Sequence, residues 1–117
     1  MIKTFVIDFS ESKRITNILT KSGCSVESEK TDGARAYKLI VELMPDLIFV
    51  NYKNKPSHGR QTAISVKQRK KTTQIPIYFV DGKQIENQKI KELGESIKFD
   101  EIENIVKLKR KLADKKI

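Results

Sequence analysis

Four polar side chains stand directly after short apolar runs of the chain, at Asp8, Asn51, Asp81 and Lys98. Carboxylates can act as nucleophiles or hold a hard divalent cation, and a lysine can neutralise the charge on a transferring phosphoryl group. An amide such as Asn51 does neither, because its nitrogen is no nucleophile and its oxygen carries no charge. The set therefore holds parts of an ion-binding site but no complete catalytic constellation.

Each of these residues also has a purely local interpretation. Asp8 can cap the turn into the next helix, and Asn51 can hydrogen-bond the loop that follows it. The pair Asp81-Gly82 is a favourable turn and helix N-cap, and lysines such as Lys98 lie mostly on the surface. The residues alone leave both interpretations open.

Short apolar runs alternate along the chain with segments of helical periodicity. Strands are predicted at residues 4–7, 24–28, 47–50, 75–80 and 96–98. Helices are predicted at residues 11–21, 33–44, 60–70, 83–93 and 100–112, the first with Ser10 as its N-cap and the last with a capping box of Asp100 and Glu103. This alternation implies an α/β fold, a three-layer doubly wound five-stranded parallel sheet with helices on both faces. Ligand sites in such sheets lie at the carboxyl ends of the strands, where the four polar residues stand.

The same pattern predicts the core. Its central members are Ile7, Ile40, Phe49, Val50 and Ile77. The helix before Pro45 is expected to bury Tyr37, Ile40, Val41 and Met44, and the last helix to bury Ile102, Ile105, Val106 and Leu112. With 117 residues the chain is long enough to bury such a core as one domain, residues 1–117, of which 113–117 are expected to be a frayed tail.

Cysteine content and hydropathy limit the class of protein. The single cysteine, Cys24, excludes a disulfide scaffold or a thiolate metal cluster within one chain, and it is expected to be a small buried hydrophobe. No apolar run approaches a membrane span, and the first residues lack the pattern of a signal peptide. We therefore expect a cytoplasmic protein without a membrane partner.

The chain has a formal net charge of +9, and its basic residues are distributed unevenly along the sequence. No acid occurs between Asp46 and Asp81, and a candidate anion-facing surface there comprises Lys53, Lys55, Arg60, Lys67, Arg69, Lys70 and Lys71. A second surplus closes the chain at Lys107, Lys109, Arg110, Lys111, Lys115 and Lys116. Neither an aromatic stacking platform nor a known nucleic-acid motif accompanies these residues, so solvated helix faces are the favoured interpretation.

Several motifs share the spacing of a known family. Asp32-Gly33 through Ala36 and the run Pro45-Asp46-Leu47-Ile48-Phe49-Val50-Asn51 are similar to its second helix and third strand, and Gly59, Ile75-Pro76 and Phe99-Asp100 match later junctions. On these motifs the chain resembles the receiver domain of two-component response regulators over essentially its whole length. The resemblance implies a flavodoxin-like sheet with strand order 2-1-3-4-5.

In that family a strand-end aspartate is phosphorylated, an acid pair holds the cation, a hydroxyl residue senses the product and a lysine neutralises charge. The resemblance assigns these roles to a relict phosphorylation site formed by Asn51, Asp8-Phe9, Asp81 and Lys98. Three of the positions depart from the family, because the acceptor is an amide, one acid of the pair is a phenylalanine and the hydroxyl is an acid. The proline that usually follows the lysine is also missing, and the segment before it is several residues short.

These departures predict an atypical pseudo-receiver that cannot be phosphorylated, is not an enzyme and uses no metal or cofactor. The resemblance implies a stand-alone signalling protein that binds a protein partner through the face formed by residues 83–93, 96–98 and 100–112. Homodimerisation stays open. The alternative function is a basic nucleic-acid-associated protein that uses Lys53–Lys71 and the C-terminal lysines.

Overall fold

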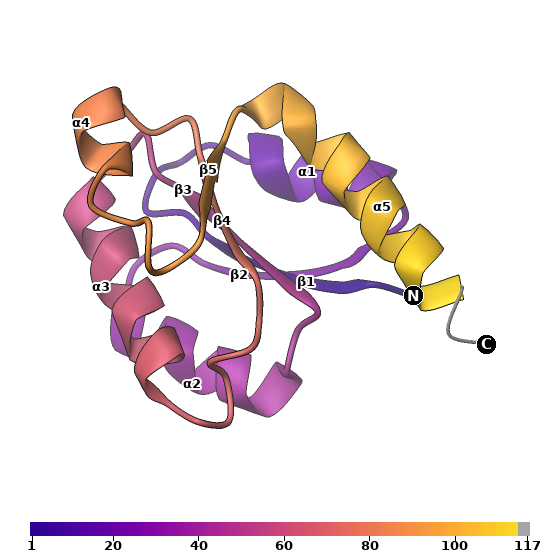
Figure 1. The fold of residues 1–117 in the computed structure, drawn as a ribbon, viewed down its shortest axis with the longest axis horizontal. Helices are drawn as coiled ribbons and strands as arrows, with labels where there is room; N and C mark the ends of the chain where they lie inside the picture. Colours follow the sequence, from indigo (N-terminus) through magenta and orange to yellow (C-terminus); the bar gives the residue numbers. More distant parts are fainter. Residues whose placement is uncertain (115–117) are drawn as a thin grey trace.

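The computed structural model describes residues 1–114, in which strands and helices alternate along the chain (Figure 1). The strands are β1 (Lys3–Ile7), β2 (Ser25–Glu29), β3 (Leu47–Asn51), β4 (Ile77–Val80) and β5 (Glu95–Ile97). The helices are α1 (Arg14–Lys21), α2 (Gly33–Leu43), α3 (Pro56–Gln68), α4 (Gln84–Asn87), the 3-10 helix η1 (Phe99–Glu101) and α5 (Ile102–Asp114). Every predicted strand is present, with bounds that differ by at most two residues.

All strands run parallel, in the order β2-β1-β3-β4-β5. This confirms the predicted α/β class and the strand order that the resemblance implied. Helices α1 and α5 cover one face of the sheet, and α2 and α3 cover the other (Figure 1). Ile7 pairs with Val50, and Val50 pairs with Phe79, so β1, β3 and β4 end level with one another. Side chains that follow these strands therefore meet at one edge, the carboxyl edge of the sheet.

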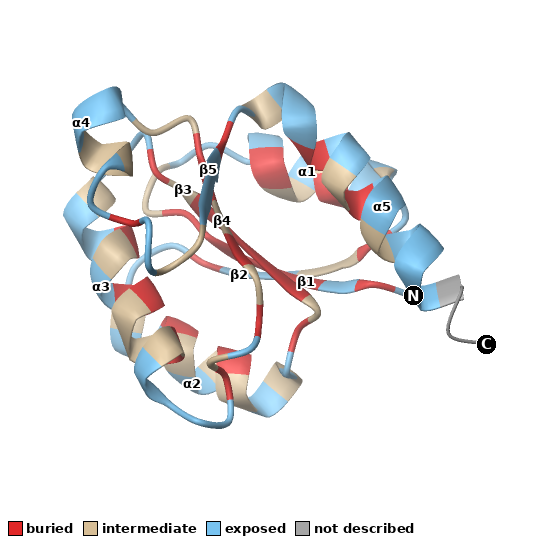
Figure 2. Ribbon diagram, in the orientation of Figure 1, coloured by how far each residue is buried: buried red, intermediate tan, exposed pale blue. Residues whose placement is uncertain are grey.

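Two apolar clusters fill the space between the sheet and its helices (Figure 2). The predicted central core residues are all at most 2% exposed: Ile7, Ile40, Phe49, Val50 and Ile77. Cys24 is buried as well, which confirms the expectation for the single cysteine. Within residues 1–114, no helix is both long and apolar enough to cross a bilayer.

The helices α3 and α4 differ from their predicted bounds. Helix α3 begins at Pro56, four residues early, because proline is accepted in the first turn, where its missing N–H needs no partner. Helix α4 is a single turn rather than a helix over 83–93. Only Ile90 in that segment is fully buried, while Ile85 is 67% exposed, so a longer helix would have little to pack against the sheet.

The apolar face predicted for α2 is also displaced. This helix buries Ala36 and Ile40, whereas Tyr37 and Val41 are only half-buried. Met44 is exposed because it takes a left-handed backbone conformation (φ 49°) that ends the helix before Pro45. The expected burial of Met44 is therefore wrong.

Helix α5 buries Ile102 and Val106 as predicted, but Leu112 is 50% exposed. The predicted capping box does not form, since η1 precedes the helix and the side chains of Asp100 and Glu103 form no hydrogen bond within residues 1–114. The helix continues to Asp114, so the first part of the expected frayed tail is helical. Residues 115–117 of that tail lie outside the described part of the chain.

Candidate functional site

The carboxyl edge brings Asp8 and Asn51 into direct contact. The Asn51 side-chain amide, Nδ2, donates a hydrogen bond of 3.0 Å to Asp8 Oδ1. The pairing of β1 with β3 produces this contact, because Ile7 and Val50 are register partners and the next residue of each strand follows at the same level. The acceptor position of the relict phosphorylation site is therefore tied to its remaining acid.

The Asp8 carboxylate is only 6% exposed and its Oδ1 accepts two further hydrogen bonds from Ser10. The donors are the Ser10 backbone N–H at 2.9 Å and its hydroxyl at 2.6 Å. The Ser10 hydroxyl in turn accepts the Ser12 N–H at 3.1 Å, the bond that an N-cap residue makes, but residues 11–13 are not helical. Helix α1 begins at Arg14, three residues later than predicted, and Ser10 is a partner of Asp8 rather than the N-cap of this helix.

Both polar atoms of the Asn51 side chain are engaged. Besides Asp8, its Nδ2 lies 3.4 Å from the acceptor atoms of Ser10 and Asn54. Its Oδ1 accepts the Lys53 backbone N–H at 3.2 Å. The amide therefore holds the loop after β3, as the local interpretation of the sequence expected, and it does so at the position of a phosphoacceptor.

Asp81 occupies the end of β4 with a left-handed backbone conformation (φ 57°). Its Oδ1 accepts the Phe99 backbone N–H at 3.0 Å, which connects the end of β4 to the segment after β5. It does not cap α4, whose N-cap residue is Lys83 and whose first turn has no side-chain cap. The N-cap interpretation of Asp81-Gly82 is therefore wrong, and the acid instead faces the carboxyl edge.

The cation beside this acid is Arg14, not Lys98. Arg14 Nη1 lies 4.0 Å from Asp81 Oδ2, and its guanidinium covers the Phe99 ring at 4.1 Å. Lys98 is exposed, and its side chain takes part in no hydrogen bond or ion pair with the side chains described, those of residues 1–113. Arg14, Asn51, Asp81 and Phe99 line a common cavity of about 230 Å³. Sequence reasoning missed Arg14 because it follows no strand and only the fold of residues 8–13 brings it there.

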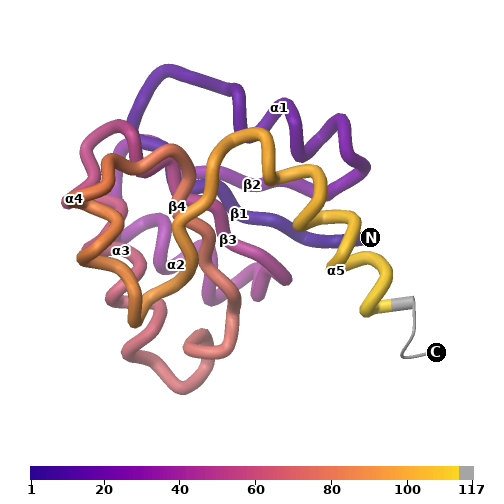
Figure 3. The backbone as a smooth tube through the Cα atoms, turned by 45° about the horizontal axis from the view of Figure 1, so that its top comes forward, coloured from indigo at the N-terminus to yellow at the C-terminus, as the bar shows by residue number. Residues whose placement is uncertain are grey.

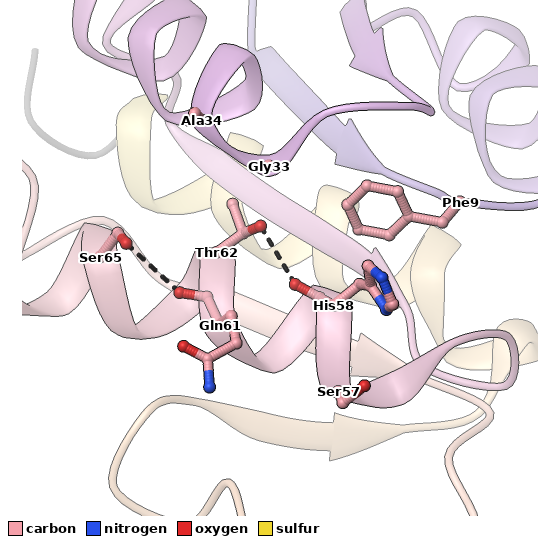
Figure 4. Close-up of a pocket in the computed structure, with 8 residues that line it drawn as sticks. All are labelled: Phe9, Gly33, Ala34, Ser57, His58, Gln61, Thr62 and Ser65. Carbon is pink, nitrogen blue, oxygen red and sulfur yellow. Dashed lines mark hydrogen bonds between the residues drawn. The ribbon is translucent and has the colours of Figure 1, made fainter.

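The side chain of Phe9 lies on the face of the sheet that α2 and α3 cover. Its ring packs against the core under α2 and α3 and lies 5.6 Å from the His58 ring (Figure 4). The two rings lie at one end of a groove of about 520 Å³ between α2 and α3. The hydroxyls of Thr62 and Ser65 in this groove donate to carbonyls of their own helix, so they offer a ligand no convergent donors (Figure 4). Phe9 is thus a packing residue, and its side chain does not face Asp8.

Glu29 supports the carboxyl edge from β2, a role that the sequence analysis did not identify. Its carbonyl accepts the Asp8 N–H at 3.1 Å, and its carboxylate accepts hydrogen bonds from Thr31 and Asp32. Arg35 approaches the same carboxylate at 3.3 Å. Burial raises the pKa of the Glu29 carboxyl, but these hydrogen bonds and Arg35 outweigh it and hold the pKa below its ordinary value. The ionised group fixes the turn from β2 into α2.

The seven basic residues of the candidate anion-facing surface do not form one surface. Arg60 donates to the Tyr52 hydroxyl and pairs with Glu86, both at 3.0 Å. The Lys67 ammonium donates to two backbone carbonyls, at 2.7 and 3.0 Å, and its burial lowers its pKa. Arg69 lies over the Tyr37 ring at 5.1 Å.

The remaining four basic residues lie at opposite ends of α3. Lys53 and Lys55 precede the helix at the carboxyl edge, and Lys70 and Lys71 follow its other end. A helix of 13 residues separates the two pairs by about 20 Å. The nucleic-acid alternative, which uses Lys53–Lys71 and the C-terminal lysines, gains no support from this arrangement.

The residues present do not fit the magnesium ion that a receiver domain would hold. Mg²⁺ requires octahedral oxygen coordination, usually with more than one acid nearby. Here Asp8 Oδ1 already accepts hydrogen bonds from three donor groups, and the inward-packed Phe9 replaces the second acid of the pair. Arg14 lies beside Asp81, the other acid at this edge. Among residues 1–113, whose side chains the structure describes, no three Asp, Glu, His or Cys side chains are grouped as metal ligands.

Millimolar magnesium should therefore leave the melting temperature of the protein unchanged. The matched control is Asp8→Asn, which keeps the shape of the side chain and removes its charge. The measurement is thermal unfolding of both proteins with and without magnesium chloride. A rise in melting temperature that occurs in the wild type and disappears in Asp8→Asn would reveal a working cation site and contradict this prediction.

Comparisons with known proteins match this chain by structure only. No protein-family model and no curated protein matches it. The N-terminal domain of a response regulator receiver protein from Methanoculleus marisnigri JR1 is 18% identical, with a TM-score of 0.68 over 84% of each chain. Chemotaxis protein CheY4 from Vibrio cholerae is 20% identical, with a TM-score of 0.74 over 94% of this chain and 98% of that one. A response regulator from Desulfuromonas acetoxidans is 17% identical, with a TM-score of 0.70 over 97% and 98% of the two chains. The chain therefore has the fold of response-regulator receiver domains.

Proposed function

We propose that this protein is a pseudo-receiver, a signalling domain that binds a protein partner without being phosphorylated and without enzymatic activity. The observation that carries the proposal is the 3.0 Å hydrogen bond from the Asn51 amide to Asp8 at the position of the phosphoacceptor. An amide cannot form an acyl phosphate, and this one already uses both of its polar atoms.

The charges around the site support the same proposal. Asp81 presents a carboxylate at the end of β4, where a receiver would use a hydroxyl to contact the phosphoryl group. Arg14 lies 4.0 Å from that carboxylate and supplies a positive charge from within the chain. Arg14 thus offsets the charge of Asp81, and the Asp8 carboxylate is stabilised by hydrogen bonds from Ser10 and Asn51.

The segment that carries α4 is held in one position by contacts to β3 and α3. The hydroxyl of Tyr52, a residue that is 1% exposed, donates to the Glu86 carbonyl at 3.0 Å. Arg60 pairs with the Glu86 carboxylate at 3.0 Å, and a Cβ at Gly82 would collide with the Tyr52 ring. These contacts support a docking face of fixed shape rather than one that phosphorylation rearranges.

The proposed docking face consists of α4, β5 and the side of α5 next to them, as the resemblance implied. Ile85 of α4 is 67% exposed, Glu95 and Ser96 of β5 are exposed as well, and both β5 residues line a hollow with Gln84 and Asn87 of α4. The edge strand β5 presents unpaired backbone groups with which a partner can pair, and Ile85 adds apolar surface to that face.

The test is a comparison of partner binding with and without a phosphodonor. Proteins crosslinked to the wild type should be the same, in the same amounts, whether or not acetyl phosphate and magnesium are present. Ile85→Arg and Ser96→Arg should each abolish the crosslink, whereas Gln61→Arg, an exposed position on α3, should leave it intact. A partner that binds only in the presence of the phosphodonor would contradict the proposal.

A further inference from the structure

The free edge of the sheet at β5 leaves two backbone groups of Ser96 without a partner. The Asp81 N–H donates to the Ile97 carbonyl at 2.9 Å, so the backbone groups of Ile97 face β4. Successive residues of a strand point these groups to opposite sides, and those of Ser96 therefore face away from β4. Within residues 1–114, no hydrogen bond reaches the N–H or the carbonyl of Ser96. The outer side of β5 thus offers one donor and one acceptor to a ligand.

A hollow of about 550 Å³ lies beside this edge. It is lined by β5 and by the segment that carries α4, through residues that include Glu95, Ser96, Gln84, Gln88 and Ile90. In both backbone views the chain leaves α4, reverses its direction and returns as β5, so this segment flanks the strand (Figures 1 and 3). The segment does not pair with β5, whose neighbour among the described strands is β4 alone. The outer side of β5 is therefore open.

The side chain of Ser96 lies on the face of the sheet that borders the hollow. Ile97 packs into the cluster under α1 and α5, and side chains alternate along a strand, so Ser96 faces the other layer. Ile90, which is 1% exposed, belongs to that other layer and forms part of the wall of the hollow. A residue that pairs with Ser96 from outside would place its own side chain on the same face, over this apolar wall.

The unpaired groups of Ser96 identify the kind of ligand. A helix uses its backbone groups internally and offers Ser96 only side chains. An extended chain carries an N–H and a carbonyl on one residue at the spacing that Ser96 requires, and its main chain continues along the edge. A peptide strand is therefore the ligand that this edge matches.

Charged side chains on either side of Ser96 narrow the choice of peptide. Glu95 is exposed, and Lys98 is exposed and continues the extended backbone (φ −97°, ψ 156°). Neither forms an ion pair with a side chain of residues 1–113. In an antiparallel pair, the peptide residue two positions before the partner of Ser96 lies opposite Lys98, and the residue after that partner lies opposite Glu95. Opposite charges stabilise cross-strand pairs, so the edge favours an acid at the first position and a base at the second.

A second copy of the chain fits the same edge less well. If two β5 strands paired antiparallel about Ser96, Glu95 would lie opposite Ile97 of the second copy. Lys98 would lie opposite Gly94. Both charges would then lack a partner, whereas a separate peptide is free to carry the matching ones.

We propose that the partner adds an extended peptide segment to β5 as a sixth, antiparallel strand of the sheet. The N–H and the carbonyl of one peptide residue bond the carbonyl and the N–H of Ser96, and its apolar side chain lies over the hollow beside Ile90. An acid two residues earlier pairs with Lys98, and a base one residue later pairs with Glu95. This inference rests on the proposed function, since it names the kind of protein segment that the docking face receives.

The test is an NMR titration of the isotope-labelled protein with the peptide Thr-Glu-Thr-Val-Lys-Val-Thr, blocked at both ends. Its first valine is the residue intended to pair with Ser96, so its glutamate meets Lys98 and its lysine meets Glu95. The backbone amide signals of Ser96 and Lys98 should shift. Those of Val26 and Ser28, on the other edge strand β2, should not.

Methylation of single peptide nitrogens tests the main-chain bonds. A methyl group on the nitrogen of the first valine removes the donor to the Ser96 carbonyl and should lower the affinity about tenfold. A methyl group on the nitrogen of the following lysine is the matched control, because that N–H points away from β5. It should change the affinity by less than about twofold.

Variants of the protein test the same bonds from the other side. Ser96→Pro removes the edge donor without breaking a ladder bond and should lower the affinity about tenfold. Ser96→Ala keeps the N–H and should stay within about twofold of the wild type. Ser28→Pro is the control on β2, where the Asp8 N–H donates to the Glu29 carbonyl and the Ser28 N–H therefore also faces outward. Circular dichroism checks folding, and if Ser96→Pro unfolds, the methylated peptides decide the question.

Charge reversal tests the register of the added strand. Lys98→Glu should weaken binding of the peptide about fivefold, because it places two acids opposite each other. A peptide with lysine in place of its glutamate should bind Lys98→Glu as tightly as the original peptide binds the wild type.

Several outcomes would overturn strand addition at β5. They are an unshifted Ser96 amide signal, equal losses from the two methylated peptides, and equal binding of the peptide by Ser96→Pro and the wild type. The crosslinked partner separates this inference from the proposed function. A partner captured equally by wild type and Ser96→Pro, with or without a phosphodonor, would retain the proposed function and reject strand addition. Peptide binding as expected, beside a partner captured only with the phosphodonor, would retain strand addition and contradict the proposed function.

Discussion

Acetyl phosphate should leave the wild type unmodified, and Asn51→Asp should not restore efficient phosphorylation. The substitution returns a nucleophile, but it places a second carboxylate about 3 Å from the Asp8 carboxylate in place of an amide donor. It also leaves Asp81 at the position where the phosphoryl oxygens would lie. Each such electrostatic defect costs about 3 kcal/mol of transition-state stabilisation, roughly a hundredfold in rate. Intact-mass spectrometry after incubation with acetyl phosphate and magnesium measures the added phosphoryl group.

The exchange variant Asp8→Asn with Asn51→Asp isolates the cause. It moves the carboxylate to position 51 while an amide at position 8 can still donate to it, so the repulsion of the single variant is absent. This double variant should be about as stable as the wild type, whereas Asn51→Asp alone should be less stable at neutral pH. Both should remain unphosphorylated, since Phe9 still stands where a receiver domain has the second acid of its cation-holding pair.

A receiver domain with an intact acid pair is the positive control for the phosphodonor. A phosphoryl mass on the wild type would refute the pseudo-receiver proposal outright. Rapid labelling of Asn51→Asp would show that the single missing nucleophile, and not its surroundings, is what distinguishes this site from an active one.

Phe49→Ala should reduce the free energy of unfolding by about 3–5 kcal/mol. Phe49 is fully buried on β3, the middle strand of the sheet, and its ring stacks on Tyr78 with a centroid distance of 5.5 Å. Truncation removes this contact and leaves a cavity between the sheet and the helices α1 and α5. Because domains of this size are stable by only about 5–15 kcal/mol, the loss is a large share of the total. Urea denaturation followed by circular dichroism provides the measurement.

The matched control is Ile85→Ala on α4, where the side chain is 67% exposed. Its effect should stay within about 0.5 kcal/mol, because little apolar surface leaves water at that position on folding. Near-neutral stability of Phe49→Ala would be inconsistent with the central position of β3 and with the core assignment that follows from it.

The positions of the strands and the centre of the core could be predicted from the sequence. Runs such as Leu47–Val50 are apolar at every position, and a strand buried on both faces is the structure that satisfies such a run. The bounds of the helices could be predicted less accurately from the sequence. Pro56 favours the start of a helix because its φ is fixed and it needs no partner for an N–H, and the hydrogen bonds of Ser10 form a turn that delays α1. Apolar periodicity reports neither effect.

For the candidate site, too, one part could be predicted from residue types and another part depended on the tertiary structure. The sequence determined that no acyl phosphate can form, because residue type alone makes Asn51 an amide and Phe9 a hydrocarbon. Only the tertiary structure decided which groups meet. The register of β1 with β3 joined Asn51 to Asp8, the late start of α1 brought Arg14 rather than Lys98 to Asp81, and alternation along β1 turned Phe9 into the core. Contacts between residues far apart in the chain depend on strand register and side-chain direction, and neither is encoded in the identity of a single residue.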